Sequence, residues 1–161
     1  MDTAMSQSGQ VLWGSVVLSL CAIIHVGLLA VIIEPLETLG RWMRTRRRAT
    51  RTAILTGVAF GMIVFSHTVQ IWLWAYFLMW MGALVEFYDA LYFSLVTYTT
   101  VGYGDLILPV EFRVFGAFGG ITGILCFGIS TAFLVSQVSS IMPSAIDQSF
   151  DSKPRSGDKD T

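Results

Sequence analysis

The chain has 161 residues, of which 54% are hydrophobic and only 13% charged, and its mean hydropathy is +0.66. Soluble domains carry about 25% charged residues, so this composition excludes an ordinary soluble protein and predicts a small integral membrane protein. The net charge of −1 is uninformative, but basic residues cluster within residues 41–51. Cys21 and Cys126 both lie in apolar runs, which favours buried packing residues over a disulfide framework.

The first apolar run covers residues 11–34 and follows a short polar segment, residues 1–10, that contains no lysine or arginine. About 20 helical residues cross the hydrocarbon of a bilayer, so the run predicts a transmembrane helix. A cleavable signal peptide would need a basic start and a shorter apolar core. Glu34-Pro35 is expected to end the helix, because the residue before a proline leaves the helical region.

Residues 35–52 are predicted to form a basic linker. The positive-inside rule places this linker in the cytoplasm and residues 1–10 outside. A voltage-sensing helix would also repeat arginines, but the sequence offers no separate span to house one. The favoured interpretations are an orientation signal and a segment that binds anionic lipid headgroups, and the two can coexist. The arginines concerned are Arg41, Arg44, Arg46, Arg47, Arg48 and Arg51.

A second apolar stretch extends from Ala53 to about Gly82. As one straight helix it would be about 45 Å long, more than the hydrocarbon thickness, so it either tilts or breaks. A polar group at residues 66–70 lies in its middle, and several tryptophans typical of an interfacial belt follow. We therefore favour a span that ends near residues 71–74, with an interfacial continuation.

Residues 88–99 predict a short helix with Asp89 as its N-cap. The segment is too short to cross a bilayer and fits a re-entrant helix that enters from outside and stops in mid-membrane. The negative end of its dipole would favour a cation there. Pro109 marks the outer turn, and residues 112–140 predict the third span. The polar residues 143–161 are expected to be a disordered cytoplasmic tail.

Between these spans, residues 99–105 read Thr-Thr-Val-Gly-Tyr-Gly-Asp. Unpaired backbone groups cost several kcal/mol in lipid, so such a segment must line water or bind something. Its two glycines alternate with Val101 and Tyr103, which permits dihedrals of alternating hand and carbonyl oxygens that point the same way. A row of such oxygens can replace the water shell of a cation.

The string closely resembles the selectivity filter of the potassium channel family, and the resemblance covers residues 53–140. It implies that potassium, the transported cargo, binds main-chain oxygens, with a threonine hydroxyl added at the inner site; no organic cofactor is expected. The implied ligands are Thr100, Val101, Gly102 and Tyr103. The residues expected to support the filter are Thr99, Gly104, Asp105 and Tyr92.

One position departs from the family pattern. Some members carry a glutamate on the pore helix that pairs with the aspartate after the filter, and the matching position here is Val96. Asp105 is therefore expected to find another partner, such as Tyr92 or a neighbouring subunit.

The resemblance implies an all-α membrane protein with three transmembrane helices, a re-entrant pore helix, and a filter loop (residues 100–105). Its pore domain, residues 53–142, would assemble as a fourfold homotetramer, because a ring of carbonyls needs several strands around one axis. The expected function is passive potassium conduction across the plasma (inner) membrane by a multi-pass protein. The alternatives are a non-selective or non-conducting relative and an accessory subunit of another channel. The sequence offers no metal cluster, phosphate loop or Ser-His-Asp set that would favour an enzyme.

Three further features bear on gating. The third span contains five glycines, for which close helix packing is the simpler explanation, and Gly123 is the hinge candidate. His25 and His67 are ionisable residues inside predicted spans, where each can simply bond a neighbouring helix. We hypothesise that His67 makes opening sensitive to pH.

The extra first helix is expected to pack on the outer helix and face lipid.

Overall fold

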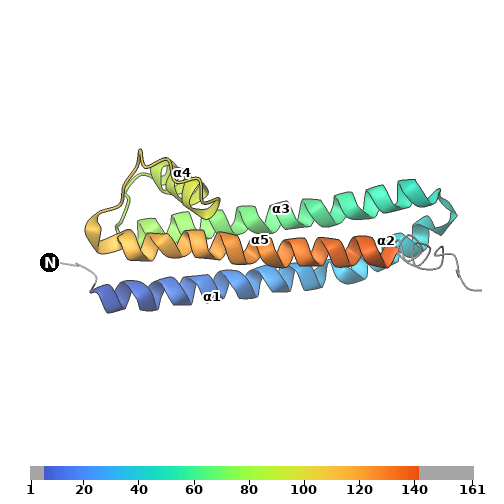
Figure 1. Cartoon of the computed structure of the whole chain (residues 1–161), viewed down its shortest axis with the longest axis horizontal. Coiled ribbons are helices and arrows are strands. Elements are labelled where there is room, and N and C mark those ends of the chain that lie inside the picture. The colour runs from blue at the N-terminus through green and yellow to red at the C-terminus, as the bar shows by residue number, and fades with distance from the viewer. Residues whose placement is uncertain (1–5, 142–161) are drawn as a thin grey trace, which may run out of the picture.

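The computed structural model describes residues 6–141. Three long helices run side by side along one axis: α1 (Gln7–Val31), α3 (Arg48–Trp80) and α5 (Arg113–Ile141) (Figure 1). No strand occurs within the described range. Three helical stretches are long and apolar enough to cross a membrane, which confirms the predicted all-α architecture with three candidate spans. The predicted tail, residues 143–161, lies outside the described residues.

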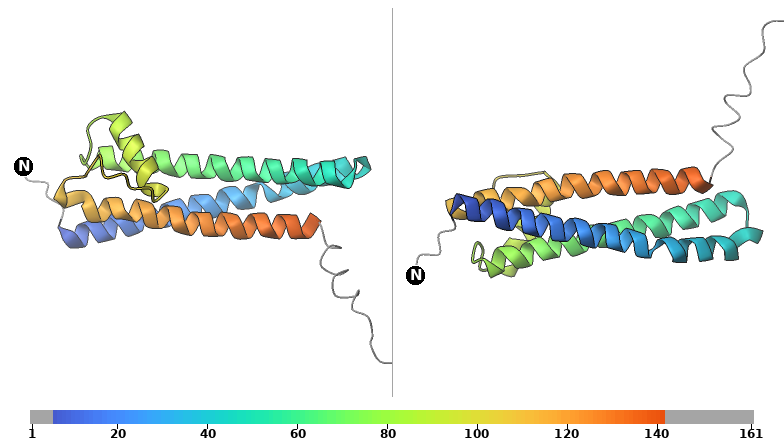
Figure 2. Two further views of the ribbon diagram at one scale, coloured as in Figure 1. Left: turned by 45° about the horizontal axis from the view of Figure 1, so that its top comes forward. Right: turned by 90° about the horizontal axis from the view of Figure 1, so that it is seen from below.

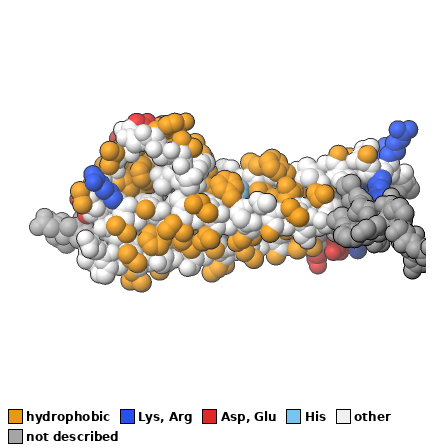
Figure 3. All heavy atoms as spheres, viewed as in Figure 1, with side chains coloured by type: hydrophobic (Ala, Val, Ile, Leu, Met, Phe, Trp, Pro, Cys, Tyr) orange, Lys and Arg blue, Asp and Glu red, His pale blue; other side chains and the backbone are white. Residues whose placement is uncertain are grey.

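The outer surface of the bundle suits a lipid environment. On the face drawn in Figure 3, hydrophobic side chains are spread along the bundle, and charged side chains gather near its two ends. On α1, Ile23 and Val31 are each 70% exposed. Water would disfavour so many exposed apolar side chains, whereas the hydrocarbon of a bilayer does not.

After α1 the chain forms a second helix, α2 (Ile33–Trp42), and a 3-10 turn, η1 (Met43–Thr45). Pro35 lies in the first turn of α2, where a missing N–H costs no helical hydrogen bond. The expectation that Glu34-Pro35 ends a helix was therefore wrong: α1 ends earlier, and helix resumes through the proline. Much of the predicted linker, residues 35–52, is helical.

α3 is continuous over 33 residues, so the predicted break near residues 71–74 was wrong. The polar group that suggested the break lies within the helix, and its members Ser66, His67 and Gln70 are buried. Their polar atoms bond other side chains rather than interrupting the backbone hydrogen bonds. A helix of this length rises about 50 Å, so it must tilt or project beyond the hydrocarbon.

The chain between α3 and α5 folds back along the bundle. The short helix α4 (Phe87–Tyr98) lies near the end of the bundle that carries the start of α1 (Figures 1 and 2). Extended chain then returns to that end, where a 3-10 turn, η2 (Val110–Phe112), leads into α5. α4 begins after Glu86, so the prediction of Asp89 as N-cap was wrong. Asp89 lies in the first turn, where its charge favours the helix dipole.

α1 contacts α3, the predicted outer helix, as expected, and it also packs on α5. The side-chain oxygen of buried Gln10 accepts hydrogen bonds from the backbone N–H groups of Val114 (3.0 Å) and Phe115 (3.3 Å). Amides in the first turn of a helix have no partner within it, so α1 supplies the missing acceptor. One turn along α1, a side chain at Gly14 would overlap the ring of Phe118, so the two helices lie close.

We expect Gln10→Ala to lower the free energy of unfolding by about 1 kcal/mol, the usual effect of removing a capping acceptor. The measurement is thermal unfolding of the purified protein in detergent. Gln7→Ala, at an exposed position of the same helix, is the control and should leave the transition unchanged. Equal destabilisation by both changes would show that Gln10 does not act as a cap.

Candidate functional site

α4 ends in a turn that sends the chain back outward. The N–H of Thr100 donates to the carbonyl of Thr97 (2.9 Å), and that of Val101 donates to the carbonyl of Val96 (3.0 Å). This is the Schellman arrangement, whose residue after the C-cap is left-handed and usually glycine. Thr100 takes that conformation with φ 60°, at a cost of about 1–2 kcal/mol relative to a right-handed residue. Thr100 thus holds a backbone conformation in which glycine would be relaxed.

The left-handed conformation recurs at every second residue of the returning segment. Gly102 has φ 56° and Gly104 has φ 77°, and Thr100 begins the series. The alternation predicted for the glycines is present, and Thr100 extends it by one step. A Cβ added to either glycine would meet nothing within 4 Å, so the backbone conformation, and not space, calls for glycine there.

Asp105 is held by the helix beside it. The hydroxyl of Tyr92 donates to one oxygen of this carboxylate, and the N–H of Leu106 donates to the other at 3.1 Å. The Tyr92 hydrogen bond lowers the pKa of Asp105 below its usual value. Tyr92, one of the two expected alternatives, is thus the partner within the chain. Tyr92 and Val96 both line a cavity of about 160 Å³ between α4 and the returning segment.

Tyr92→Phe should raise the pKa of Asp105 toward the usual value of an aspartate, because the hydrogen bond that lowers it is lost. In the wild type the hydrogen bond contributes stability above the unfolded pKa, and this contribution is lost as pH falls through the lower folded pKa. A carboxyl NMR titration of Asp105 measures the shift. Tyr88→Phe, at an 82% exposed tyrosine of the same helix, is the control. An unshifted Asp105 titration in Tyr92→Phe would contradict the assigned partner.

The C-terminal end of α4 rests directly on the backbone of α5. A side chain at Gly123 would overlap the carbonyl oxygen of Tyr98, and one at Gly120 would lie 3.3 Å from the carbonyl oxygen of Thr97. Two of the five glycines in this helix thus allow close approach, as the packing interpretation predicts. The hinge proposed at Gly123 remains a prediction, and α5 is an unbroken helix there.

The sequence model of the ion channel family matches residues 55–140, more than half of the chain. The chain belongs to the ion channel family. Comparison with curated proteins and with solved structures found no match. The matched region contains most of α3, nearly all of α5 and the whole of α4 with its returning segment, whereas α1 lies outside it.

In this ion channel, six buried polar side chains meet beside the C-terminal end of α4. His67, the predicted pH-sensing residue, lies among them and bonds the hydroxyl of Tyr98 through Nδ1 at 2.8 Å. α1 brings His25 to the same cluster. For the remaining members of the cluster, the only signal in the sequence is that they are polar residues within apolar helices. The full set is His25, Ser66, His67, Gln70, Tyr98 and Ser130.

The returning segment of the ion channel is largely uncovered in a single chain. Val101 is 53% exposed and Tyr103 is 73% exposed. On α5, Ile124 is 61% exposed. Apolar side chains at the depth of a membrane need lipid or protein around them, whereas the polar backbone beside them needs protein or water. The described residues of one chain therefore leave these side chains and the backbone beside them to be covered by lipid, water or further protein.

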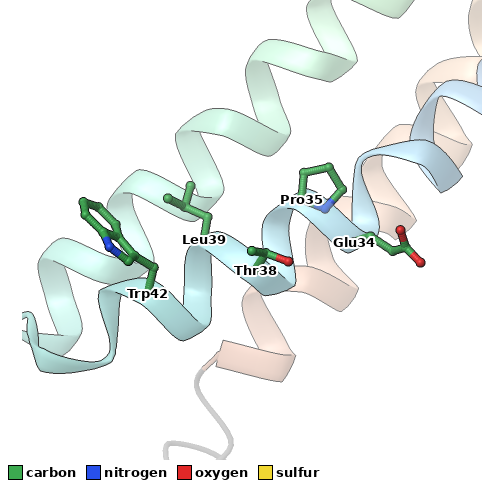
Figure 4. A pocket seen from close by; sticks show the side chains of 5 residues that line it. All are labelled: Glu34, Pro35, Thr38, Leu39 and Trp42. Atoms are coloured by element: carbon green, nitrogen blue, oxygen red, sulfur yellow. The ribbon is translucent and has the colours of Figure 1, made fainter.

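The arginine-rich segment lies at the opposite end of the bundle from α4 (Figure 1). There, α2 alone lines a shallow surface hollow, shown in Figure 4. Trp42 at its edge is 78% exposed, and the guanidinium of Arg41 donates to the hydroxyl of Thr38 at 3.1 Å. The residues of the hollow are Glu34, Pro35, Thr38, Leu39 and Trp42.

Proposed function

We propose that this ion channel is selective for potassium and conducts it passively. The alternation of left-handed residues along residues 100–104 carries the proposal, because it permits successive carbonyl oxygens to face one side. The proposed potassium ligands are the main-chain oxygens of Thr100, Val101, Gly102 and Tyr103, with the hydroxyl of Thr100 at the inner end. Thr99, Gly104, Asp105 and Tyr92 would hold this segment in place.

The proposed pore is formed by four identical chains. One strand of carbonyls covers only one side of an ion, so several copies around an axis are needed to replace a hydration shell. The exposure of Val101 and Tyr103 supports this, because neighbouring copies would cover their side chains. α4 would enter from the outer face, and the negative end of its dipole, at Tyr98, would favour a cation near the inner end of the filter.

The proposed location is the plasma (inner) membrane, with the N-terminus outside and the C-terminus in the cytoplasm. The arginines and the start of α1 lie at opposite ends of the bundle, which supports this orientation. The arginines are proposed to bind anionic lipid headgroups. Exposed Trp42 beside them is a residue type that anchors helices at the membrane interface.

The test is ion flux through the purified protein in liposomes, with barium as blocker and with potassium and sodium gradients. A barium-sensitive reversal potential that follows the potassium gradient supports the proposal. Flux without discrimination between the two ions would favour a non-selective relative, and no flux by the protein alone would favour an accessory subunit. The subunit count comes from the mass of the detergent-solubilised complex, for which a monomer or dimer would contradict the tetrameric pore.

The lipid proposal is tested in the same assay with vesicles that contain or lack anionic lipid. Replacing the six arginines of residues 41–51 by glutamine should weaken the dependence of flux on anionic lipid. Wild-type flux that is unchanged between the two vesicle types would rule out a role for these headgroups.

A further inference from the structure

Five buried side chains, drawn from α1, α3, α4 and α5, close a ring of hydrogen bonds beside the filter segment. The five distances around the ring are similar and lie between 2.8 and 3.1 Å. The ring starts at Gln70, whose Nε2 lies beside His25 Nδ1, and the other nitrogen of His25, Nε2, lies beside Ser130 Oγ. Ser130 Oγ also lies beside His67 Nε2. The other nitrogen of His67, Nδ1, lies beside the Tyr98 hydroxyl, which returns to Gln70 at Oε1.

The amide of Gln70 sets the direction of these bonds. An amide nitrogen only donates, so Nδ1 of His25 must accept and the proton of this imidazole must be on Nε2. Nε2 then donates to the hydroxyl oxygen of Ser130, at 3.0 Å. The first half of the ring therefore specifies one tautomer of a neutral His25.

The second half of the ring follows in the same direction. The hydroxyl of Ser130 donates to Nε2 of His67, which leaves the proton of that imidazole on Nδ1. Nδ1 donates to the hydroxyl of Tyr98, which in turn donates to the side-chain oxygen of Gln70. The two neutral histidines thus carry opposite tautomers, and each bond polarises the next.

The titratable groups around His25 come from every helix packed against it. These are His67 on α3, Tyr98 on α4 and Cys126 on α5, with Cys21 one turn away on α1 itself. Ser66 also lies 2.8 Å from Nδ1 of His25. The sequence has no Asp, Glu, Lys or Arg within residues 7–31, 52–80 and 114–141, and α4 has only Asp89, in its first turn. An imidazolium in the ring would have no counter-charge within the three charge-free stretches, and Asp89 lies at the opposite end of α4 from Tyr98.

A proton added to the ring breaks it at a defined place. On His25 it would occupy Nδ1, which would then donate to Ser66 Oγ at 2.8 Å, and the bond from the amide nitrogen of Gln70 would be lost because two donors cannot share it. An amide that turned over would recover a bond to Nδ1, but it would present its nitrogen to Tyr98 and take away the acceptor of the Tyr98 hydroxyl. On His67 the proton would occupy Nε2 and displace the hydroxyl proton of Ser130. Tyr98 directly precedes Thr99, so either event reaches the base of the filter segment.

We propose that α1 is a proton-responsive brace for the filter, in which His25 is a positioning residue that closes the ring. With both histidines neutral, the ring holds the C-terminal end of α4 against α5. A proton on either histidine opens the ring and releases that end. The proposal rests on the proposed function in that it takes residues 100–105 as the filter, and it gives α1 a role that the hypothesis for His67 alone did not contain.

The first experiment reads the ring without ion flux. The full chain, with ¹⁵N-labelled histidine and backbone, is placed in lipid nanodiscs and followed by NMR from about pH 7 to about pH 4. The expected result is a proton on Nε2 of His25 and on Nδ1 of His67 at the upper pH. As the histidines take up protons, the amide signals of residues 99–101 should shift with them. The same tautomer in both rings, or amide signals that stay still while the histidines titrate, would overturn the brace.

The second experiment removes the link from α1. His25→Phe should abolish the pH response of residues 99–101, and His25→Gln, which keeps a donor and an acceptor, should restore part of it. Ser130→Ala cuts the ring from α5 and gives the same test should His25→Phe not fold. Leu29→Ala, at a buried apolar position one turn along α1, is the matched control and should keep the full response. A wild-type response in both His25→Phe and Ser130→Ala would overturn the proposal.

Flux separates this inference from the proposed function. In liposomes at neutral pH, His25→Phe should lower the potassium-to-sodium permeability ratio about tenfold, the effect of one lost hydrogen bond. A wild type that passes no ions yet shows the expected tautomers and pH response would contradict the potassium channel and support the brace. Selective conduction with a ratio and pH response untouched by His25→Phe would overturn the brace alone.

Discussion

Gly123→Ala is expected to lower the free energy of unfolding by about 3 kcal/mol, at the upper end for overpacking a buried site. The new methyl group would overlap the carbonyl oxygen of Tyr98, which belongs to the backbone and cannot rotate away as a side chain would. α4 would have to move off α5, and the proposed filter segment would move with it. The proposed potassium flux should therefore be lost. Thermal unfolding and liposome flux measure the two effects.

Gly128→Ala is the matched control on the same helix. A Cβ at Gly128 would meet nothing within 4 Å. Alanine is favoured over glycine inside a helix by about 1 kcal/mol, so this variant should be at least as stable as the wild type. If Gly123→Ala were as stable as Gly128→Ala but altered gating, the packing explanation would fail and Gly123 would act as a hinge.

Gly102→Ala should reduce potassium flux at least tenfold while changing thermal stability only slightly. The glycine has φ 56° and open space around it, so alanine would add about 1–2 kcal/mol of backbone strain and no collision. Relief of that strain would turn a carbonyl oxygen away from the proposed ion path, and each 1.4 kcal/mol lost there is about tenfold. Liposome flux and reversal potentials measure the change.

Gly57→Ala is the control for this prediction. Gly57 also has nothing within 4 Å of an added Cβ, but it lies in α3 with an ordinary helical φ. Alanine there should leave flux unchanged. Equal loss of flux in both variants would mean that the left-handed conformation of Gly102 is not what conduction requires.

Hydropathy was sufficient to predict three spanning helices, because runs of apolar residues have few other uses at this length. Part of the backbone course of residues 100–104 was also predictable, because Gly102 and Gly104 favour a left-handed conformation that other residues avoid. The left-handed conformation of Thr100 could not be predicted, because it follows from the way α4 ends and not from the residue type.

The contacts between the helices could not be predicted from the sequence, for a physical reason. α1, α3 and α5 are apolar on all sides, so no amphipathic stripe indicates which face meets which neighbour. The predicted break in α3 failed for the same reason: residues 66–70 were read as an interruption, whereas Ser66, His67 and Gln70 bond polar side chains of other helices. The ring joins residues up to 105 positions apart, and no local pattern links them.

The hydrogen bonds from α5 to Gln10 have a consequence for biogenesis. The acceptor precedes the first of its two donors by 104 residues, so a ribosome delivers α1 to the membrane long before α5 emerges. When the first turn of α5 enters the membrane, the side-chain oxygen of Gln10 is already in place to accept hydrogen bonds from its unpaired amides. Insertion of α5 and its packing against α1 would then occur together. In a chain whose truncation removes Gln10, water or lipid headgroups would have to accept the hydrogen bonds of these amides instead.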